Sequence, residues 1–373
     1  MKSSVPPRAV DACDRCLRRT DLLAGISGHL DVEWRRRRGM AAILAAPDDA
    51  LLELDPSGVA GRRFGAFSVE RARAAIQAAG LSALCRCSPR YPDRLRDLGD
   101  PPAVIHVAGR LDALYEVDSV GIVGARRATP YGVAVARQLG RGLSAAGVPV
   151  VSGLALGVDS AAHAGAVEGR APAVAVLAGG ADVPYPARMR SLHARIAERG
   201  CVVSEMPPGF VARRWCFVAR NRIIAAAGAV TVVVEAAIRS GSLSTADFAA
   251  QLGRTVAAVP GPVTSPLSAG TNALIAEGAV LVRDGRDVLD HLASTGAVAW
   301  PDDERAVDEL PPELRTVLAA IEGGHDPLSD PQAAHGDVAG VLAALTELEL
   351  AGLVTRGFGG GYVRVRSAGG ARG

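Results

Sequence analysis

The chain has 373 residues, 49% of them apolar, and a formal net charge of +2 at pH 7. This length is enough for two or three domains, and no run reaches the ~18 uninterrupted apolar residues that cross a bilayer. The near-neutral charge neither favours nor excludes nucleic acid, since a basic strip on one face can coexist with acidic residues elsewhere. Because no apolar segment follows the basic residue in "MKSSVPPRAVDACDRC", we predict no secretory signal, no membrane segment and a cytoplasmic location.

Residues 1–115 are predicted to form an N-terminal helical domain with a linker. The runs "EWRRRRG" and "SVERARAAIQAAG" have helical composition, and Gly80 suits a helix C-cap. The segment "SPRYPDRLRDLGDPPAVIHVAG" holds enough proline for a linker that docks on the next domain.

Four of the six cysteines fall in two close pairs at the two ends of this first domain, Cys13 with Cys16 and Cys85 with Cys87. The spacing suits tetrahedral zinc ligation if the fold brings the pairs together. The alternative is that they are unpaired small apolar residues. A structural zinc is therefore one of two interpretations, and we expect no other cofactor.

Residues 116–295 alternate β-branched runs with helical segments. The expected strands are "SVGIVG", "VPVVSG", "APAVAVLAG", "GCVVSE", "AVTVVVE", "RTVAAVPG" and "AVLV". Near-continuous apolar strands separated by helices are typical of a mostly parallel sheet covered on both faces. The predicted fold class is α/β, with an extended Rossmann-like, doubly wound core.

Residues 296–312 are a proline- and acid-rich linker, and residues 313–373 follow as a third unit. "ELRTVLAAIEGG" and "DVAGVLAALTELELAGL" have helical patterns, and "LVTRGFGGGYVRVR" alternates around a glycine turn. Two helices and a hairpin predict a winged-helix-like domain.

The loop "GIVGARRATPYG" joins the first core strand to its helix. Its glycines, with Gly124 at the strand end, and the following helix N-terminus predict an anion cradle beside Arg126 and Arg127. The third glycine of the dinucleotide fingerprint is missing. The alternative is a packing turn with incidental arginines.

The next loop, "SGLALGVDSAAHAGAVEG", begins at Ser152 with Gly153 after it and places Asp159 and His163 four residues apart on one helix face. A hydrolase would use such a pair, but nothing in the spacing supplies a nucleophile. We therefore predict that both are structural.

Three later loops and one helix add candidates at the same sheet edge. Gly179 and the segment "VPYPARMR" contribute Tyr185, which either stacks on a base or is a structural aromatic, and Arg188. Glu205 ends the next strand, and Glu235 ends the strand "AVTVVVE", where it would orient arginines or loop amides. Convergence of these loops on one edge predicts a binding site. The remaining candidates are Arg220, Asn221, Arg222, Ser240, Gly241 and Ser242.

Seven segments carry a resemblance to a known family: "VGARRATPYG", "VSGLALGVDSAAHAGAVEG", "VAVLAGGADVPYP", "VVSEMPPG", "FVARNRIIAAAG", "VVVEAAIRSGSLSTADFAAQLGR" and "AVPGPVTSPLSAGTNALIAEGA". In this order they resemble the DNA-processing protein A family, also called DprA or Smf. The resemblance implies a homodimeric, non-enzymatic protein of natural transformation that binds single-stranded DNA, protects incoming DNA and loads the RecA recombinase. It also implies that the arginine after the first glycine loop, here Arg126, contacts DNA.

Two other functions remain as alternatives. A phosphoribohydrolase of the lysine-decarboxylase-like superfamily would carry a PGG-x-GT-x-x-E signature, and the nearest segments here, "LAGGADVPYP" and "VPGPVTSPLSAGTN", lack its glutamate. A transcription regulator would need base-reading polar side chains on its recognition helix, but "VAGVLAALTELELAG" is mainly leucine and alanine with acidic residues.

Overall fold

The computed structural model describes residues 10–36, 39–115, 118–294, 310–322, 327–328, 337–350, 353–356 and 362–364. The chain forms two compact units, Met1–Leu292 and Ala293–Gly373. The predicted domain boundary at residue 116 and residues 296–309 of the predicted linker lie outside the described residues. Within the described part of the chain, no helix is both long and apolar enough to cross a membrane.

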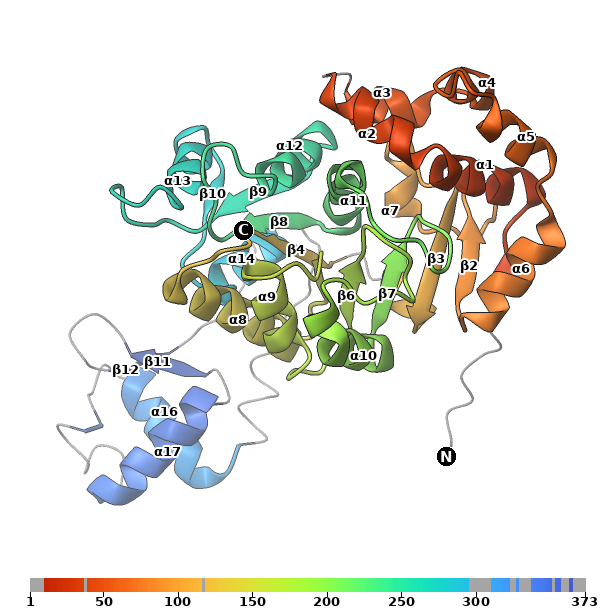
Figure 1. Ribbon diagram of the computed structural model, residues 1–373. Coiled ribbons are helices and arrows are strands. Elements are labelled where there is room, and N and C mark those ends of the chain that lie inside the picture. The colour runs from red at the N-terminus through yellow and green to blue at the C-terminus, as the bar shows by residue number, and fades with distance from the viewer. Residues whose placement is uncertain are drawn as a thin grey trace, which may run out of the picture. The chain divides into compact units, whose positions relative to one another are not determined.

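The first unit is built on one sheet, which comprises ten strands among the described residues (Figure 1). The strands are β1 (Val10–Asp11), β2 (Ser82–Cys85), β3 (Val104–Gly109), β4 (Val120–Val123), β5 (Val150–Ser152), β6 (Ala173–Val176), β7 (Cys201–Ser204), β8 (Val230–Val233), β9 (Thr255–Ala258) and β10 (Val280–Leu281). Their order is β1-β2-β3-β7-β6-β5-β4-β8-β9-β10. From β7 to β10 in this order all neighbours are parallel, whereas β3 is antiparallel to both β7 and β2. Each predicted core strand is present, and the predicted mostly parallel α/β fold is confirmed.

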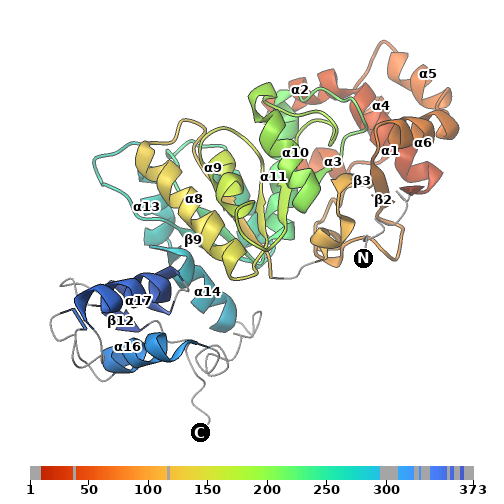
Figure 2. The same ribbon diagram turned by 90° about the horizontal axis from the view of Figure 1, so that it is seen from below.

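Helices cover both faces of this sheet, which explains why its central strands are apolar throughout. The α-helices up to residue 294 are α1 (Asp14–Gly25), α2 (Ser27–Arg35), α3 (Met40–Ala45), α4 (Asp48–Leu52), α5 (Val59–Gly65), α6 (Val69–Ala78), α7 (Asp93–Arg96), α8 (Pro130–Ala145), α9 (Val158–Ala166), α10 (Arg190–Arg199), α11 (Arg214–Ala227), α12 (Leu243–Gln251), α13 (Ala269–Ala276) and α14 (Gly285–Ser294). Two short 3-10 helices are η1 (Leu111–Leu114) and η2 (Ala187–Met189). Helices α8, α9 and α10 lie on one face and α11 and α12 on the other (Figure 1), and α8 runs beside α9 (Figure 2).

The N-terminal segment is helical, as predicted, but it also extends the sheet. The run expected to be a linker contains β3, which is buried from Val104 to Val107 between β2 and β7. An apolar run of this kind gains more by pairing on both sides than by crossing the surface as a loop. Helix α2 docks on the core through Trp215, whose indole Nε1 donates to Ser27 Oγ at 2.9 Å.

The second unit has its own apolar core, in which Leu318, Leu345 and Leu348 are buried. Its described elements are α16 (Pro312–Glu322), α17 (Val338–Leu350), β11 (Val354–Arg356) and β12 (Tyr362–Arg364). The two strands pair antiparallel, as the predicted hairpin requires. Because most of "HDPLSDPQAAHG" lies outside the described residues, the winged-helix-like assignment stays a prediction.

Candidate functional site

The loops that follow strands β4 to β9 meet at one edge of the sheet, because parallel strands place their carboxyl ends together. We call this edge the rim; it comprises residues 124–129, 153–157, 177–186, 205–213, 234–242 and 259–268. Strands β5, β6 and β7 extend the sheet to one side of β4, and β8, β9 and β10 extend it to the other. The chain therefore changes direction between β4 and β8, which is where open α/β sheets bind ligands.

An aromatic and basic cluster occupies the rim beside β4, β5 and β6. The guanidinium carbon of Arg126 lies 4.7 Å from the ring centroid of Phe217, a cation–π contact. The ring centroids of Phe217 and Tyr185 are 5.6 Å apart, at an interplanar angle of 52°. Arg126 is exposed and Tyr185 is 48% exposed. A cation and an aromatic ring thus face solvent side by side.

This cluster borders a small cavity of about 80 Å³, which we call the Tyr185 pocket. Arg220 lies at its inner side with only 4% exposure, and its Nη1 donates to the carbonyl of Val176 at 2.6 Å. Burial lowers the pKa of Arg220 to about 10, so the side chain remains charged at pH 7. Arg220 therefore supplies positive charge from the wall of the pocket, and its contact with DNA stays a prediction.

Gly153 is required by this arrangement. A Cβ at Gly153 would lie 1.7 Å from Arg220 Nη1, so any larger residue would displace the guanidinium. Asp159 is buried nearby; burial raises the pKa of its carboxyl group, and the charge of Arg220 acts in the opposite direction. Gly153 thus leaves room for the guanidinium of Arg220 and also lines the pocket, whereas the buried Asp159 acts on Arg220 through its charge.

Arg222 lies inside the protein, where it forms a buried ion-pair cluster. Its Nη1 and Nη2 donate to the two carboxylate oxygens of Glu205 at 2.9 and 2.8 Å, and its Nε donates to Asp100 at 3.0 Å. Its remaining donors bond to the carbonyls of Ala219 and Asp100. Burial by itself lowers the pKa of Arg222, but Glu205 and Asp100 outweigh it and raise that pKa. The prediction that Arg222 contacts DNA is wrong, because all of its donors are used within the protein and it is 2% exposed.

Glu235 contacts a loop amide, which is one of its two predicted roles. Its carboxylate accepts from Thr129 N at 2.9 Å and from Thr129 Oγ1 at 2.5 Å. Thr129 Oγ1 in turn accepts from Gly132 N, capping helix α8. The carboxylate therefore occupies the place of an anion at this helix N-terminus. The loop was predicted to be an anion cradle, but two of its amides bond within the protein instead. Thr129 N donates to the Glu235 carboxylate, and Ala125 N donates to the carbonyl of Glu235 at 2.7 Å.

The other predicted rim residues fall into two groups. Arg127 and Arg188 are exposed, as a contact with a charged polymer requires, whereas a Cβ would collide with Val158 of α9 at Gly124 and with the carbonyl of Phe210 at Gly179. Asn221 Nδ2 donates to the carbonyl of Gly241 and to Ser244 Oγ, each at 3.0 Å. This contact fastens α11 to the loop that carries Ser240, Gly241 and Ser242.

His163 is fully buried, and its Nε2 lies 3.1 Å from the carbonyl of Val174. Burial lowers the pKa of His163 to about 4. The ring is therefore neutral at pH 7 and donates to that carbonyl, a geometry that agrees with the predicted structural role.

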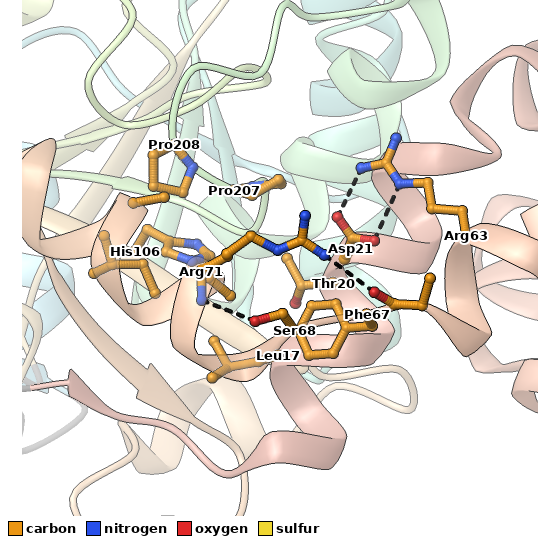
Figure 3. A pocket seen from close by; sticks show the side chains of 14 residues that line it. Leu17, Thr20, Asp21, Arg63, Phe67, Ser68, Arg71, His106, Pro207 and Pro208 are labelled. Carbon is orange, nitrogen blue, oxygen red and sulfur yellow. Dashed lines mark hydrogen bonds and ion pairs between the residues drawn. The ribbon is translucent and has the colours of Figure 1, made fainter.

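Two further cavities were not indicated by the sequence. An open groove of about 490 Å³ runs along the rim between the loops after β4, β8 and β9, where Tyr131 donates to the carbonyl of Pro260 at 3.0 Å. A cavity of about 520 Å³ lies among α1, α6, β3 and the loop after β7 (Figure 3). Arg63 pairs with Asp21 at its side, and His106 is buried in its wall. These cavities are formed by segments far apart in the chain, which explains why no local sequence motif predicted them.

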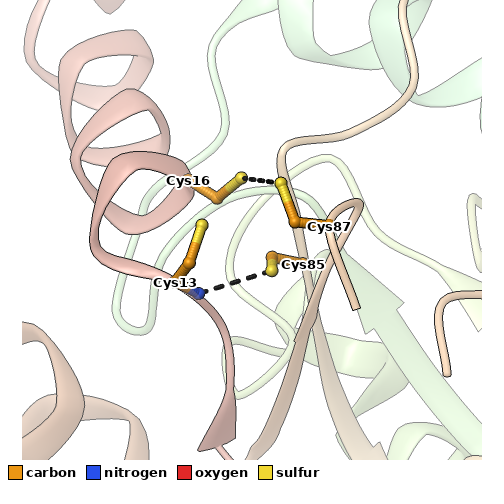
Figure 4. Close-up of side chains that lie close together, drawn as sticks. All are labelled: Cys13, Cys16, Cys85 and Cys87. Atoms are coloured by element: carbon orange, nitrogen blue, oxygen red, sulfur yellow. Dashed lines mark hydrogen bonds between the residues drawn. The ribbon is translucent and has the colours of Figure 1, made fainter. Parts of the chain in front are cut away.

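The four cysteines of the predicted metal site lie together at the ends of α1 and β2 (Figure 4). They are separate from the Tyr185 pocket, since β3 and β7 lie between β2 and β6 in the sheet.

Comparison with known proteins places the core among DNA-processing proteins. The family model for DNA recombination-mediator protein A matches residues 82–293. A Mycobacterium tuberculosis protein named as a DNA processing protein DprA is 43% identical over 266 residues, covering 70% of this chain and 68% of its own. The X-ray structure of DNA processing protein A from Streptococcus pneumoniae has 30% identity and a TM-score of 0.60, covering 74% of this chain and 95% of its own. A structure concerning the single-stranded DNA binding mode of DNA processing protein A from Helicobacter pylori has 29% identity and a TM-score of 0.53, covering 58% and 96%.

Proposed function

Because the chain belongs to the DNA recombination-mediator protein A family, we propose that it binds single-stranded DNA at the rim. The observation that carries this proposal is the exposed pair of Arg126 and Tyr185, each of which contacts the ring of Phe217. Single strands are held without sequence preference where cations meet the phosphates and aromatic rings stack on the bases. This cluster supplies both groups within one pocket.

The charges of the rim suit the sugar–phosphate backbone. Arg126, Arg127 and Arg188 are exposed and can contact phosphates directly, while the buried Arg220 adds positive potential beneath them. Tyr185 offers a ring face to a base, which duplex DNA would present only after unstacking. We therefore propose a preference for single strands over duplexes and a marked dependence on salt.

We further propose the remaining activities of the family for this chain. The bound strand is protected during natural transformation and transferred to the RecA recombinase, and the protein acts as a homodimer. Sequence similarity over the core supports this extension. Sedimentation velocity tests whether the protein is a dimer. A second assay tests the transfer of the strand to RecA: it follows ATP hydrolysis by RecA on single-stranded DNA, with and without this protein. Faster onset of hydrolysis in its presence is expected; a monomer, or no effect on RecA, would contradict these points while leaving DNA binding intact.

We propose that the protein has no enzymatic activity of its own. Three carboxylates in or next to the rim that a phosphoribohydrolase could use are engaged internally: the buried Asp159 accepts from Ala155 N, Glu205 pairs with Arg222, and Glu235 accepts from Thr129. Incubation with AMP should release no adenine above the level of a heat-inactivated sample. Release of adenine in proportion to the concentration of the protein would favour the phosphoribohydrolase alternative.

The test of DNA binding compares two charge reversals. Arg126→Glu should weaken binding to an oligothymidylate at least tenfold and lower the salt slope by about one contact or more. Arg141→Glu is the matched control, since Arg141 is exposed on α8 outside the rim and carries the same charge change. Circular dichroism checks that both variants remain folded. Equal affinity of the Arg126 variant and the parent at low salt would remove the rim as the DNA site.

A further inference from the structure

We propose that Cys13, Cys16, Cys85 and Cys87 form a structural zinc site that fastens the start of α1 to the end of β2. The four Sγ atoms all lie within 4.8 Å of one another. A tetrahedral zinc ion with Zn–S bonds of about 2.3 Å separates its sulfurs by roughly 3.8 Å. The distance from Cys16 Sγ to Cys87 Sγ is 3.7 Å (Figure 4). The cluster therefore has the dimensions of a four-thiolate site.

Contacts other than the thiols bring the two cysteine pairs together. Strand β1 pairs with β2, placing Asp11 opposite Leu84, and each cysteine pair begins just beyond this register. Ser88 Oγ donates to Asp11, and Arg73 donates to the carbonyl of Ala12 at 3.1 Å. Strand pairing and these side-chain contacts thus bring the two cysteine pairs close together without a metal, which lowers the entropy cost of binding one.

The surroundings of the cluster suit thiolates. A zinc ion with four thiolates carries a net charge of −2, which nearby donors stabilise. Cys13 N donates to Cys85 Sγ at 3.3 Å, and Arg15 Nη2 donates to Cys87 Sγ at 3.8 Å. These donors orient and partly neutralise the sulfurs.

The exposure of one member distinguishes this cluster from the cysteines that only fill the core. Cys201 and Cys216 are buried among apolar side chains, as small apolar residues are. Cys87, by contrast, is exposed while its partner Cys16 is 1% exposed. An exposed thiol at the edge of a buried cluster gains little from packing but gives a metal ion a path of entry.

The metal would strengthen the attachment of α1 to β2. Leu17, Thr20 and Asp21 follow Cys16 on this helix and line the 520 Å³ cavity. A zinc ion at the start of α1 therefore ties one wall of that cavity to the end of β2. Removing it should loosen α1 and β2 and leave the rim unchanged.

Metal content of the full-length protein, purified under reducing conditions without chelator, is the direct test. We expect about one zinc per chain and an X-ray absorption spectrum with four sulfur ligands at about 2.3 Å. Cys16→Ser with Cys87→Ser should lose the metal, whereas the control Cys216→Ala, a cysteine outside the cluster, should retain it.

A second measurement does not depend on the folding of a variant. Zinc is removed from the parent protein with a chelator, and hydrogen exchange is followed with and without added zinc chloride. Faster exchange in α1 and β2, reversed by zinc, is expected. Metal-free protein in which all four thiols are reduced, iron in place of zinc, or exchange that does not respond to zinc would overturn the proposal.

Discussion

Three arginines of similar sequence context have different roles because their burial differs. Arg126 is exposed over Phe217, Arg220 is 4% exposed behind the Tyr185 pocket, and Arg222 is enclosed by Glu205 and Asp100. Two of them are separated by a single residue on α11, so the helix turns them toward different surroundings. Charge at the rim therefore depends on side-chain environment more than on arginine count.

Arg222→Met should destabilise the protein strongly while sparing DNA binding. The change leaves Glu205 and Asp100 buried without their cation, which costs about 3–5 kcal/mol of unfolding free energy. Urea unfolding measures this loss against Arg195→Met, a control at an exposed arginine of α10. Weak DNA binding together with parental stability would instead return Arg222 to the DNA site.

His163 should make stability fall at acidic pH. The unfolded histidine binds a proton below its ordinary pKa of about 6.5, whereas burial delays protonation in the folded state to about pH 4. The unfolded state therefore binds more protons between these values, and stability decreases as pH falls from about 6.5 to about 4, by up to about 3 kcal/mol. His106, with the same lowered pKa, adds to the decrease.

His163→Asn should lose roughly 1–2 kcal/mol at pH 7 through the missing bond to Val174, and its stability should depend less on pH. Denaturant unfolding at several pH values measures both effects. DNA affinity should stay near the parental value; a large loss of affinity without a loss of stability would show that His163 belongs to the binding site.

At the scale of elements, the junction between β4 and α8 connects the rim to the fold. Thr129 caps the helix and bonds to Glu235 at the end of β8, so the two sides of the switch point are joined through one side chain. The loop between them carries Arg126. The position of Arg126 therefore depends on the cap that Thr129 forms on α8.

Thr129→Val should weaken both stability and DNA binding. The substitution removes the hydroxyl that caps α8, at a cost of about 1 kcal/mol, and it releases the loop that holds Arg126. Thr129→Ser keeps the hydroxyl and serves as the control. Thermal unfolding and oligonucleotide titration measure the two effects; a valine variant indistinguishable from the serine variant would show that the cap does not position the loop.

At the scale of the whole molecule, the chain divides its apolar cores between its two units. The core of Met1–Leu292 joins strand residues such as Val151 and Val203 to α11, whereas the second unit buries Leu318 and Leu345 among its own elements. Separate cores allow separate folding.

A chain ending at residue 300 should therefore fold and bind single-stranded DNA with an affinity within about threefold of the full chain. Calorimetry should show the transition of the first unit at an unchanged temperature, since its core is complete without the second unit. Loss of folding in the shortened chain would show that the first unit depends on residues beyond 300.

The sequence by itself determined the class of fold and which loops form the rim. Apolar runs at regular spacing identified the strands from β4 to β10, because strands buried on both faces have no polar alternation. Glycine and polar residues after each run then placed the rim, since parallel strands must end together. Tertiary structure alone decided what each polar side chain does. Arg220 and Arg222 share one helix but face different neighbours, Glu235 fills a helix terminus that a ligand could have used, and β3 joins the sheet from a proline-rich segment. These outcomes depend on residues more than a hundred positions away, since Asp100 and Arg222 are 122 positions apart and Thr129 and Glu235 are 106 apart; no local sequence pattern contains such partners.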